Sequence, residues 1–137
     1  MIFIDSNVPM YLVGDPHPHK IDAQRVLERL TVERKRMVTS SEVFQELLHR
    51  YVSIDRRDRL ESAFDLLQSI VDDVLAIEES DVFGAKNLLH AHRGLSARDA
   101  VHAAVMRHHG ITEILSFDSG FDALTGFDRL PRADSHS

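Results

Sequence analysis

The sequence contains no cysteine among its 137 residues. This absence excludes a disulfide framework, a zinc site built on thiolates and a cysteine nucleophile, and it fits a reducing compartment. No apolar run approaches the roughly 20 residues that cross a bilayer. The opening MIFID also lacks the basic start of a signal peptide. We therefore expect a cytoplasmic protein with no membrane segment.

Positive charge is scarce as well. The chain has 16 Lys and Arg against 22 Asp and Glu, which gives a net charge of −6. Such a balance offers no general attraction for nucleic acid, so any such contact must come from local cations. The segments GAKN and LTGF lack the glycine pattern and the lysine of a phosphate loop.

The nine histidines do not predict a zinc site. His17 and His19, like His90 and His92, have zinc-like spacing, but no third ligand cluster accompanies either pair. We interpret them as loop or surface residues. His102 follows Asp99 by about one helical turn, and we interpret it as a histidine of the core or of the rim of a site.

What the sequence does contain is an alternation of short apolar strands and longer amphipathic helices. We expect strands at residues 2–4, 36–39, 74–77 and 111–117, and helices at 8–13, 20–35, 39–51, 56–71, 80–92 and 96–109. Residues 117–130 are expected to form a loop with short helical pieces. This order predicts an α/β fold with a short, mostly parallel central sheet. We expect a single domain over residues 1–130 and a polar tail over 131–137.

Two acids follow two of the expected strands. Asp5 ends the first apolar run, IFI, and Asp118 follows ILSF near the end of the chain. The carboxyl ends of parallel strands share one edge of a sheet, and sites of α/β proteins form there. A turn or helix cap would explain Asp5 taken alone. A second acid at the same edge favours a site.

Two glutamates four residues apart lie on one face of the expected helix 39–51. Thr39 and Glu42 have the spacing of a capping box, which gives Glu42 a structural role. Glu46 has no such role and lies beside apolar neighbours, where its carboxylate could reach a metal ion.

The segment SARDAVHAAV leaves two interpretations open for Asp99. Ser96 and Asp99 have capping-box spacing, which would make Asp99 structural. A surface of small residues, formed by Ala97, Ala100, Ala103 and Ala104, allows close packing. Close packing would partly desolvate Asp99 and leave it in need of a partner.

Local cations lie in two runs and at one isolated position. Arg34, Lys35 and Arg36 form the first run, which we interpret as a solvated helix face. Arg56 and Arg57, followed by Arg59, form the second, and Arg98 is adjacent to Asp99. We expect Arg98, Arg56 and Arg57 to make the contacts if the substrate is a nucleic acid.

Four segments in this order resemble the PIN-domain nucleases. They are a strand ending in D-S-N, a central T-S-S-x-x-x-x-E-L, a late S-A-R-D-A-x-H and a final L-S-F-D-x-x-F-D. The length and layout are most similar to bacterial toxins of the VapC type, and the resemblance covers residues 2–127.

The resemblance implies a fold, an activity and a site. The fold would be an α/β/α sandwich, and the activity that of an endoribonuclease using Mg²⁺ or Mn²⁺. The catalytic and metal-binding residues would be Asp5, Glu46, Asp99 and Asp118, with Asn7, Ser116, Asp122 and Glu42 in supporting positions. Either glutamate could be aligned with the family, and we choose Glu46 because it precedes Leu47 in the E-L pattern.

The resemblance also implies partners. A ribonuclease of the toxin type would have an RNA substrate, a small cognate antitoxin protein and a homodimeric state. We expect the antitoxin to insert an arginine near the acids, because a guanidinium pairs well with carboxylates in a confined space.

Two other function classes remain open. A metal-dependent phosphohydrolase could use Asp5 as its nucleophile, although Asn7 stands where the common D-x-D pattern has a second acid. A catalytically silent PIN scaffold is the other, but a scaffold has no need of a complete set of acids.

Overall fold

The computed structural model of the chain describes residues 1–132. Its centre is a sheet of five strands: β1 (Ile2–Ile4), β2 (Met37–Ser40), β3 (Asp73–Leu75), β4 (Glu113–Leu115) and β5 (Asp128–Leu130). The strands lie in the order β3-β2-β1-β4-β5, and every neighbouring pair is parallel. The expected α/β class is confirmed, and the sheet is parallel throughout.

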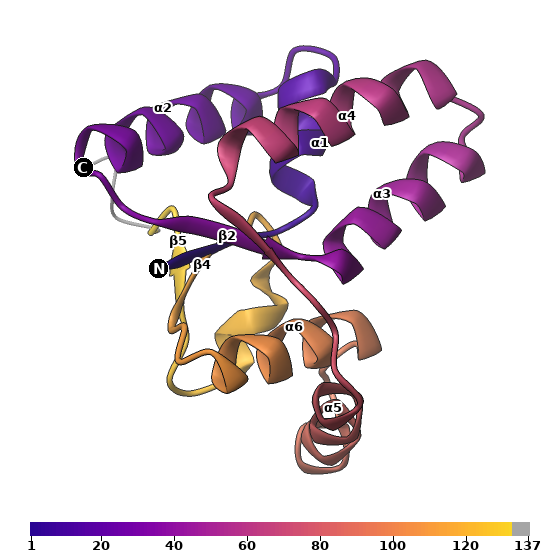
Figure 1. Ribbon diagram of the computed structural model, residues 1–137, viewed down its shortest axis with the longest axis vertical. Helices are drawn as coiled ribbons and strands as arrows, with labels where there is room; N and C mark the ends of the chain where they lie inside the picture. Colours follow the sequence, from indigo (N-terminus) through magenta and orange to yellow (C-terminus); the bar gives the residue numbers. More distant parts are fainter. Residues whose placement is uncertain (133–137) are drawn as a thin grey trace.

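Helices cover both faces of this sheet. They are α1 (Asn7–Val13), α2 (Pro18–Val32), α3 (Ser41–Ser53), α4 (Arg57–Ile70), α5 (Glu79–Ala91) and α6 (Ala97–His108), followed by the short 3₁₀ helix η1 (Ser119–Ala123). Figure 1 shows α1, α2 and α4 on one side of the sheet and α5 and α6 on the other. This is the expected α/β/α sandwich. No helix within residues 1–132 is long and apolar enough to cross a membrane.

Covering the sheet on two faces explains the apolar sequence of its central strand. Ile2, Phe3 and Ile4 are each at most 1% exposed. A strand between two helical layers has no solvent face, so it reads as a continuous apolar run instead of an alternating one.

The fifth strand was not expected, and the prediction of an irregular 117–130 segment is wrong there. Asp128–Leu130 pairs with β4, whereas Ser119–Ala123 is one of the expected helical pieces. The strand has only three residues, lies at the edge of the sheet, and buries only Leu130 fully. It therefore carries no apolar run in its sequence. Of the expected polar tail, residues 133–137 lie outside the described part.

The strand order creates one crevice at the carboxyl edge of the sheet. The chain builds outward from β1 through β2 to β3, then crosses back to place β4 on the other side of β1. Loops leaving β1 and β4 turn away from each other at such a switch point, and ligands of open α/β sheets bind in the opening between them.

Candidate active site

Asp5 lies at this switch point, directly after β1. It is 2% exposed. The backbone N–H of Ser6 donates to its Oδ1 at 2.7 Å, and the Ser116 hydroxyl donates to its Oδ2 at 2.6 Å. Hydrogen bonds to both oxygens fix the orientation of the carboxylate and offset part of its desolvation.

Ser116 and Asn7 join the ends of β1 and β4. The Ser116 hydroxyl accepts hydrogen bonds from the Asn7 amide and from the Asp118 backbone N–H, both at 3.1 Å. The Asn7 amide also reaches Asp5 Oδ2 at 3.5 Å, and its oxygen accepts from the Phe117 N–H at 3.2 Å. Both side chains therefore hydrogen-bond to Asp5 and to the segment that follows β4.

Glu46 reaches the same crevice from α3. That helix begins directly after β2, where the Ser40 hydroxyl accepts from the Val43 N–H at 3.4 Å. The expected capping box between Thr39 and Glu42 is wrong. The Thr39 hydroxyl instead donates to the Ile4 carbonyl at 2.8 Å and ties β2 to β1.

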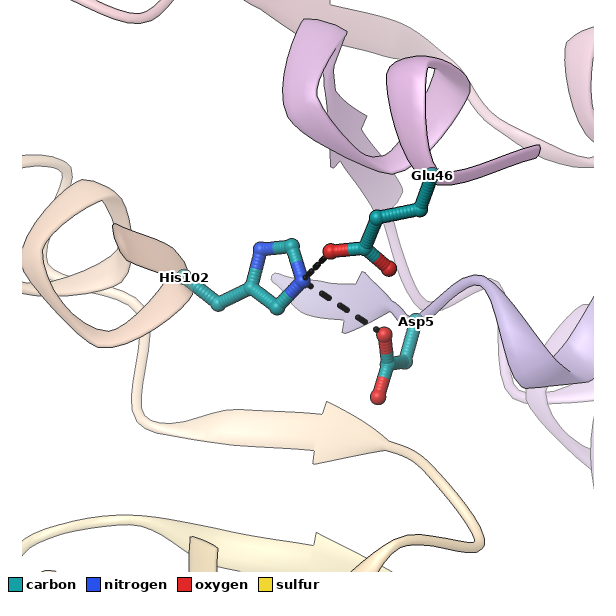
Figure 2. Close-up of side chains that lie close together, drawn as sticks. All are labelled: Asp5, Glu46 and His102. Carbon is teal, nitrogen blue, oxygen red and sulfur yellow. Dashed lines mark ion pairs between the residues drawn. The ribbon is translucent and has the colours of Figure 1, made fainter. Parts of the chain in front are cut away.

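His102 of α6 meets the two carboxylates, as Figure 2 shows. Its Nε2 lies 2.6 Å from Glu46 Oε1 and 3.6 Å from Asp5 Oδ1. By distance the first contact is an ion pair, but its angles are not those of a hydrogen bond. Complete burial lowers the pKa of His102, but the Glu46 contact and the charges of Asp5, Glu46 and Asp99 outweigh this and raise the pKa above its ordinary value.

Asp99 lies at the first turn of α6. The Ser96 hydroxyl caps this helix by accepting from the Asp99 N–H at 3.1 Å, whereas the Asp99 side chain is 2% exposed and packs against Gly120. A Cβ on Gly120 would overlap Asp99 Oδ2, so any other residue there would force the Asp99 carboxylate to shift. Burial raises the pKa of Asp99, and repulsion by Asp118 and Asp5 raises it further. The helix cap thus uses the Asp99 backbone, and its carboxylate belongs to the acidic cluster.

Asp118 completes the cluster from the loop after β4, and Arg98 faces it. Asp118 Oδ1 accepts from the Gly120 N–H at 3.0 Å, and Oδ2 lies 3.2 Å from Arg98 Nη2. Partial burial lowers the pKa of Arg98, but the carboxylates of Glu46, Asp5, Asp99 and Asp118 raise it above its ordinary value. One guanidinium therefore interacts electrostatically with all four acids that were expected to be catalytic.

Several buried carboxylate oxygens in this cluster have no hydrogen-bond partner within residues 1–132. They are both oxygens of Glu46 and Oδ1 of Asp99. Asp5, Glu46 and His102 each offer one ligand atom, and these atoms all lie within 4.8 Å of one another. Burying carboxylate oxygens that accept no hydrogen bond is costly, and a divalent cation with oxygen ligands would satisfy them. The donor set therefore fits a metal ion.

The structure does not bring every expected residue to this cluster. Asp122 is bound by both ends of the Arg129 guanidinium, at 2.9 and 3.0 Å, and this hydrogen bonding lowers the pKa of Asp122. Glu42 is half-buried on α3, one turn before Glu46.

The expected RNA-contacting arginines are divided by the structure. Arg98 lies at the acids, whereas Arg56 is paired with Asp58 at 3.0 Å. Arg57 is exposed at the start of α4.

The sequence left His102 open as a histidine of the core or of the rim of a site and did not predict its direct contact with the acids. The signal was its position three residues after Asp99, which places both on one face of α6. Histidine is common in protein cores, so spacing alone did not distinguish a residue that contacts the acids from one that fills space.

Comparison with known proteins places this geometry in a family. The PIN domain model matches residues 2–126. The chain is 55% identical to the Mycobacterium tuberculosis protein named Ribonuclease VapC13 over 130 residues, which cover 95% of this chain and 99% of the relative. It is 42% identical to Ribonuclease VapC23 of the same species, over 86% of this chain and 93% of the relative.

Among solved structures, M. tuberculosis VapC20, described as a Sarcin-Ricin loop cleaving toxin, superposes with a TM-score of 0.73 at 25% identity, covering 93% of this chain and 97% of that one. The Rickettsia felis VapBC2 structure shares the fold, with a TM-score of 0.71 at 17% identity over 94% and 97% of the two chains. Fold, length and sequence agree, so this chain belongs to the PIN-domain family and, within it, to the VapC proteins.

Proposed function

We propose that the chain is a metal-dependent endoribonuclease, the toxin of a toxin–antitoxin pair. The observation that carries the proposal is the set of buried carboxylate oxygens that accept no hydrogen bond at the switch point of the sheet. Relatives named as ribonucleases, at 55% and 42% identity, support RNA as the substrate. The proposed catalytic residues are Asp5, Glu46, Asp99 and Asp118.

The acids hold Mg²⁺, with Mn²⁺ as the substitute, because hard oxygen ligands suit both ions. The bound ion supplies a water of lowered pKa and stabilises negative charge on the phosphate. The chain's own residues supply the orientation. Ser116, Asn7 and the Ser6 N–H fix Asp5. His102 lies against Glu46 and Asp5.

An antitoxin would control this site. Solved VapBC assemblies share the fold of this chain, which supports a partner protein. We propose that the partner inserts an arginine near Asp5, Asp99 and Asp118. Arg98 illustrates the fit, since its guanidinium already pairs with Asp118 at 3.2 Å and lies 4.0 Å from Glu46. Inhibition by such an arginine should weaken as Mg²⁺ rises, because cation and guanidinium compete for the same carboxylates. Inhibition that is indifferent both to Mg²⁺ and to Arg→Ala changes in the partner would contradict this mode.

Cleavage of RNA in the presence and absence of a chelator tests the activity. We expect cleavage with Mg²⁺ as the sole divalent ion, none with EDTA, and none from Asp5→Asn. p-Nitrophenyl phosphate is the control substrate for a phosphohydrolase. Hydrolysis of that ester without RNA cleavage would favour the other enzyme class, and no activity on either would favour a scaffold.

We further propose that residues 1–130 form one nuclease domain, that the protein acts in the cytoplasm, and that it is a homodimer. Light scattering of the purified chain would measure its mass, and a mass of one chain at micromolar concentration would contradict the dimer.

A further inference from the structure

A cleft of about 740 Å³ opens beside the acidic cluster, between α1 and α3. Glu46 and Arg98 line the end nearest the acids, and Tyr11, Arg50, Tyr51 and Arg59 are among the residues that line the remaining wall. A protein with a net charge of −6 thus places three of its arginines around one cavity. Nothing in the catalytic assignment above uses Arg50, Arg59 or Tyr51.

The charge on one face of α3 changes from negative to positive along this cleft. Glu42, Glu46 and Arg50 follow one another at intervals of four residues, so they lie on the same face of the helix. Four residues of α-helix rise about 6 Å. That rise is comparable to the spacing of successive phosphates along an extended nucleic-acid strand. A strand whose reacting phosphate lies at Glu46 would therefore present a neighbouring phosphate near Arg50.

Arg50 and Arg59, which line the part of the cleft away from the acids, are available to a ligand. Arg59 and Arg98 are each paired with an acid, but no ion pair of Arg50 is found within residues 1–132. The partner of Arg59, at 2.8 Å, is Asp15, whose side chain is 85% exposed. Ion pairs with so exposed an acid are weak and easily exchanged.

Tyr51 lines the same cleft as these two arginines and adds a hydrogen-bond donor. It is 4% exposed and lines the cleft. Burial raises its pKa, although the charges of Arg59 and Arg50 act in the opposite direction. The hydroxyl therefore keeps its proton at neutral pH and can donate to a phosphate oxygen.

We propose that Arg50 and Arg59 form a subsite for a phosphate of the RNA strand next to the phosphate that is cleaved. The proposal rests on the proposed ribonuclease function and names residues outside the acidic cluster. A structural alternative exists for Arg50, since a cation in the last turn of α3 also stabilises the helix dipole. That role would affect stability and leave RNA affinity unchanged.

Binding of RNA to a non-cleaving chain separates the two roles. The assay is fluorescence anisotropy of a labelled single-stranded RNA of mixed sequence, with Asp5→Asn as the background in every protein. Arg50→Gln and Arg59→Gln are compared with Arg25→Gln, which changes an exposed arginine on α2 outside the cleft. Thermal midpoints of all variants are measured alongside.

We expect each cleft variant to weaken binding about five- to tenfold and to lower the slope of log K against log salt by about 0.7 for each phosphate that is no longer bound. Arg25→Gln should change affinity less than about twofold. If both cleft variants keep the affinity and salt slope of the background while the unmodified chain cleaves RNA, the subsite is refuted and the ribonuclease proposal stands. If the unmodified chain neither binds nor cleaves RNA with Mg²⁺, the ribonuclease proposal fails. Competition by polyglutamate as strong as that by unlabelled RNA would refute recognition of phosphate.

Discussion

Replacing Ser116 with alanine tests whether the hydroxyl at the end of β4 holds the site together. Ser116 is fully buried, and its single hydroxyl takes part in three hydrogen bonds, with Asp5, Asn7 and the Asp118 N–H. Alanine fits the space without a clash, so the change removes these bonds and little else.

The expected cost follows from the partners. A hydrogen bond to a charged group contributes about 1.5–3 kcal/mol, and leaving a buried donor unsatisfied costs about 1–3 kcal/mol. The donor of Asn7 keeps its long contact with Asp5, so it is not fully orphaned. We therefore expect the free energy of unfolding to fall by about 2–3 kcal/mol. For a chain of this size the thermal midpoint should drop by about 6–12 °C.

The measurement is urea unfolding in EDTA, so that no cation compensates for the missing hydrogen bond. Ser119→Ala, an exposed serine three residues later, is the control and should change stability by less than about 0.5 kcal/mol. In a double-mutant cycle with Asp5→Ala, the two changes should be coupled by about 1–2 kcal/mol. A loss of stability for Ser116→Ala no larger than that of the control, or strict additivity in the cycle, would refute the reasoning.

Three further results are expected from the acids and the buried histidine. Asp99→Asn should abolish cleavage yet raise the metal-free thermal midpoint at neutral pH, because the raised pKa of Asp99 makes its ionisation destabilising. This gain should vanish below about pH 4, where Asp99 is protonated in the unfolded state as well. An equal gain at about pH 3.5 would contradict the prediction. His102 has a raised pKa in the folded chain, so its contribution to stability should be complete below about pH 6.5 and should be lost as the pH rises through that folded-state pKa. The thermal midpoint of His102→Gln should therefore approach that of the unmodified chain above about pH 6.5. If the difference between the two midpoints does not shrink there, the protonation of His102 is not its cause. Glu46→Gln should reduce cleavage far more than Glu42→Gln, measured at equal protein and Mg²⁺ concentrations. If Glu42→Gln is the inactive variant, the site glutamate is one helical turn earlier.

The parts of the fold that sequence predicted are those with strong periodicity. Six helices and four strands were predicted close to their observed places, because the spacing of apolar residues along the chain shows which face of each element is buried. The convergence of Asp5 and Asp118 was also predictable, since parallel strands share their carboxyl edge. The edge strand β5 was not, because its three residues are Asp, Arg and Leu. Pairing with β4, and not an apolar pattern, holds it in place.

The sequence predicted the acids of the site better than it predicted the hydrogen bonds and packing contacts around them. Thr39 and Ser40 both have side chains that can cap a helix. The Thr39 hydroxyl is bonded to the Ile4 carbonyl, so it is Ser40 that caps α3. Asp122 has the charge of a site residue, but Arg129 from β5 binds it, and that strand was not foreseen. The burial of His102 between α6 and the acids depends on packing between segments far apart in sequence, which spacing along one helix does not report.

The strand order also sets when the site can exist during synthesis. Its residues come from the ends of β1 and β4 and from α3 and α6, so they span positions 5 to 118 of the chain. A nascent chain that has emerged only through α5 has Asp5 and Glu46 but lacks Asp99, His102, Ser116 and Asp118. Because β4 completes the crevice by pairing beside β1, the acids assemble only after nearly the whole chain has been made. Incomplete translation products therefore lack part of the acidic cluster, and the complete cluster forms only once the strand that pairs beside β1 has been made.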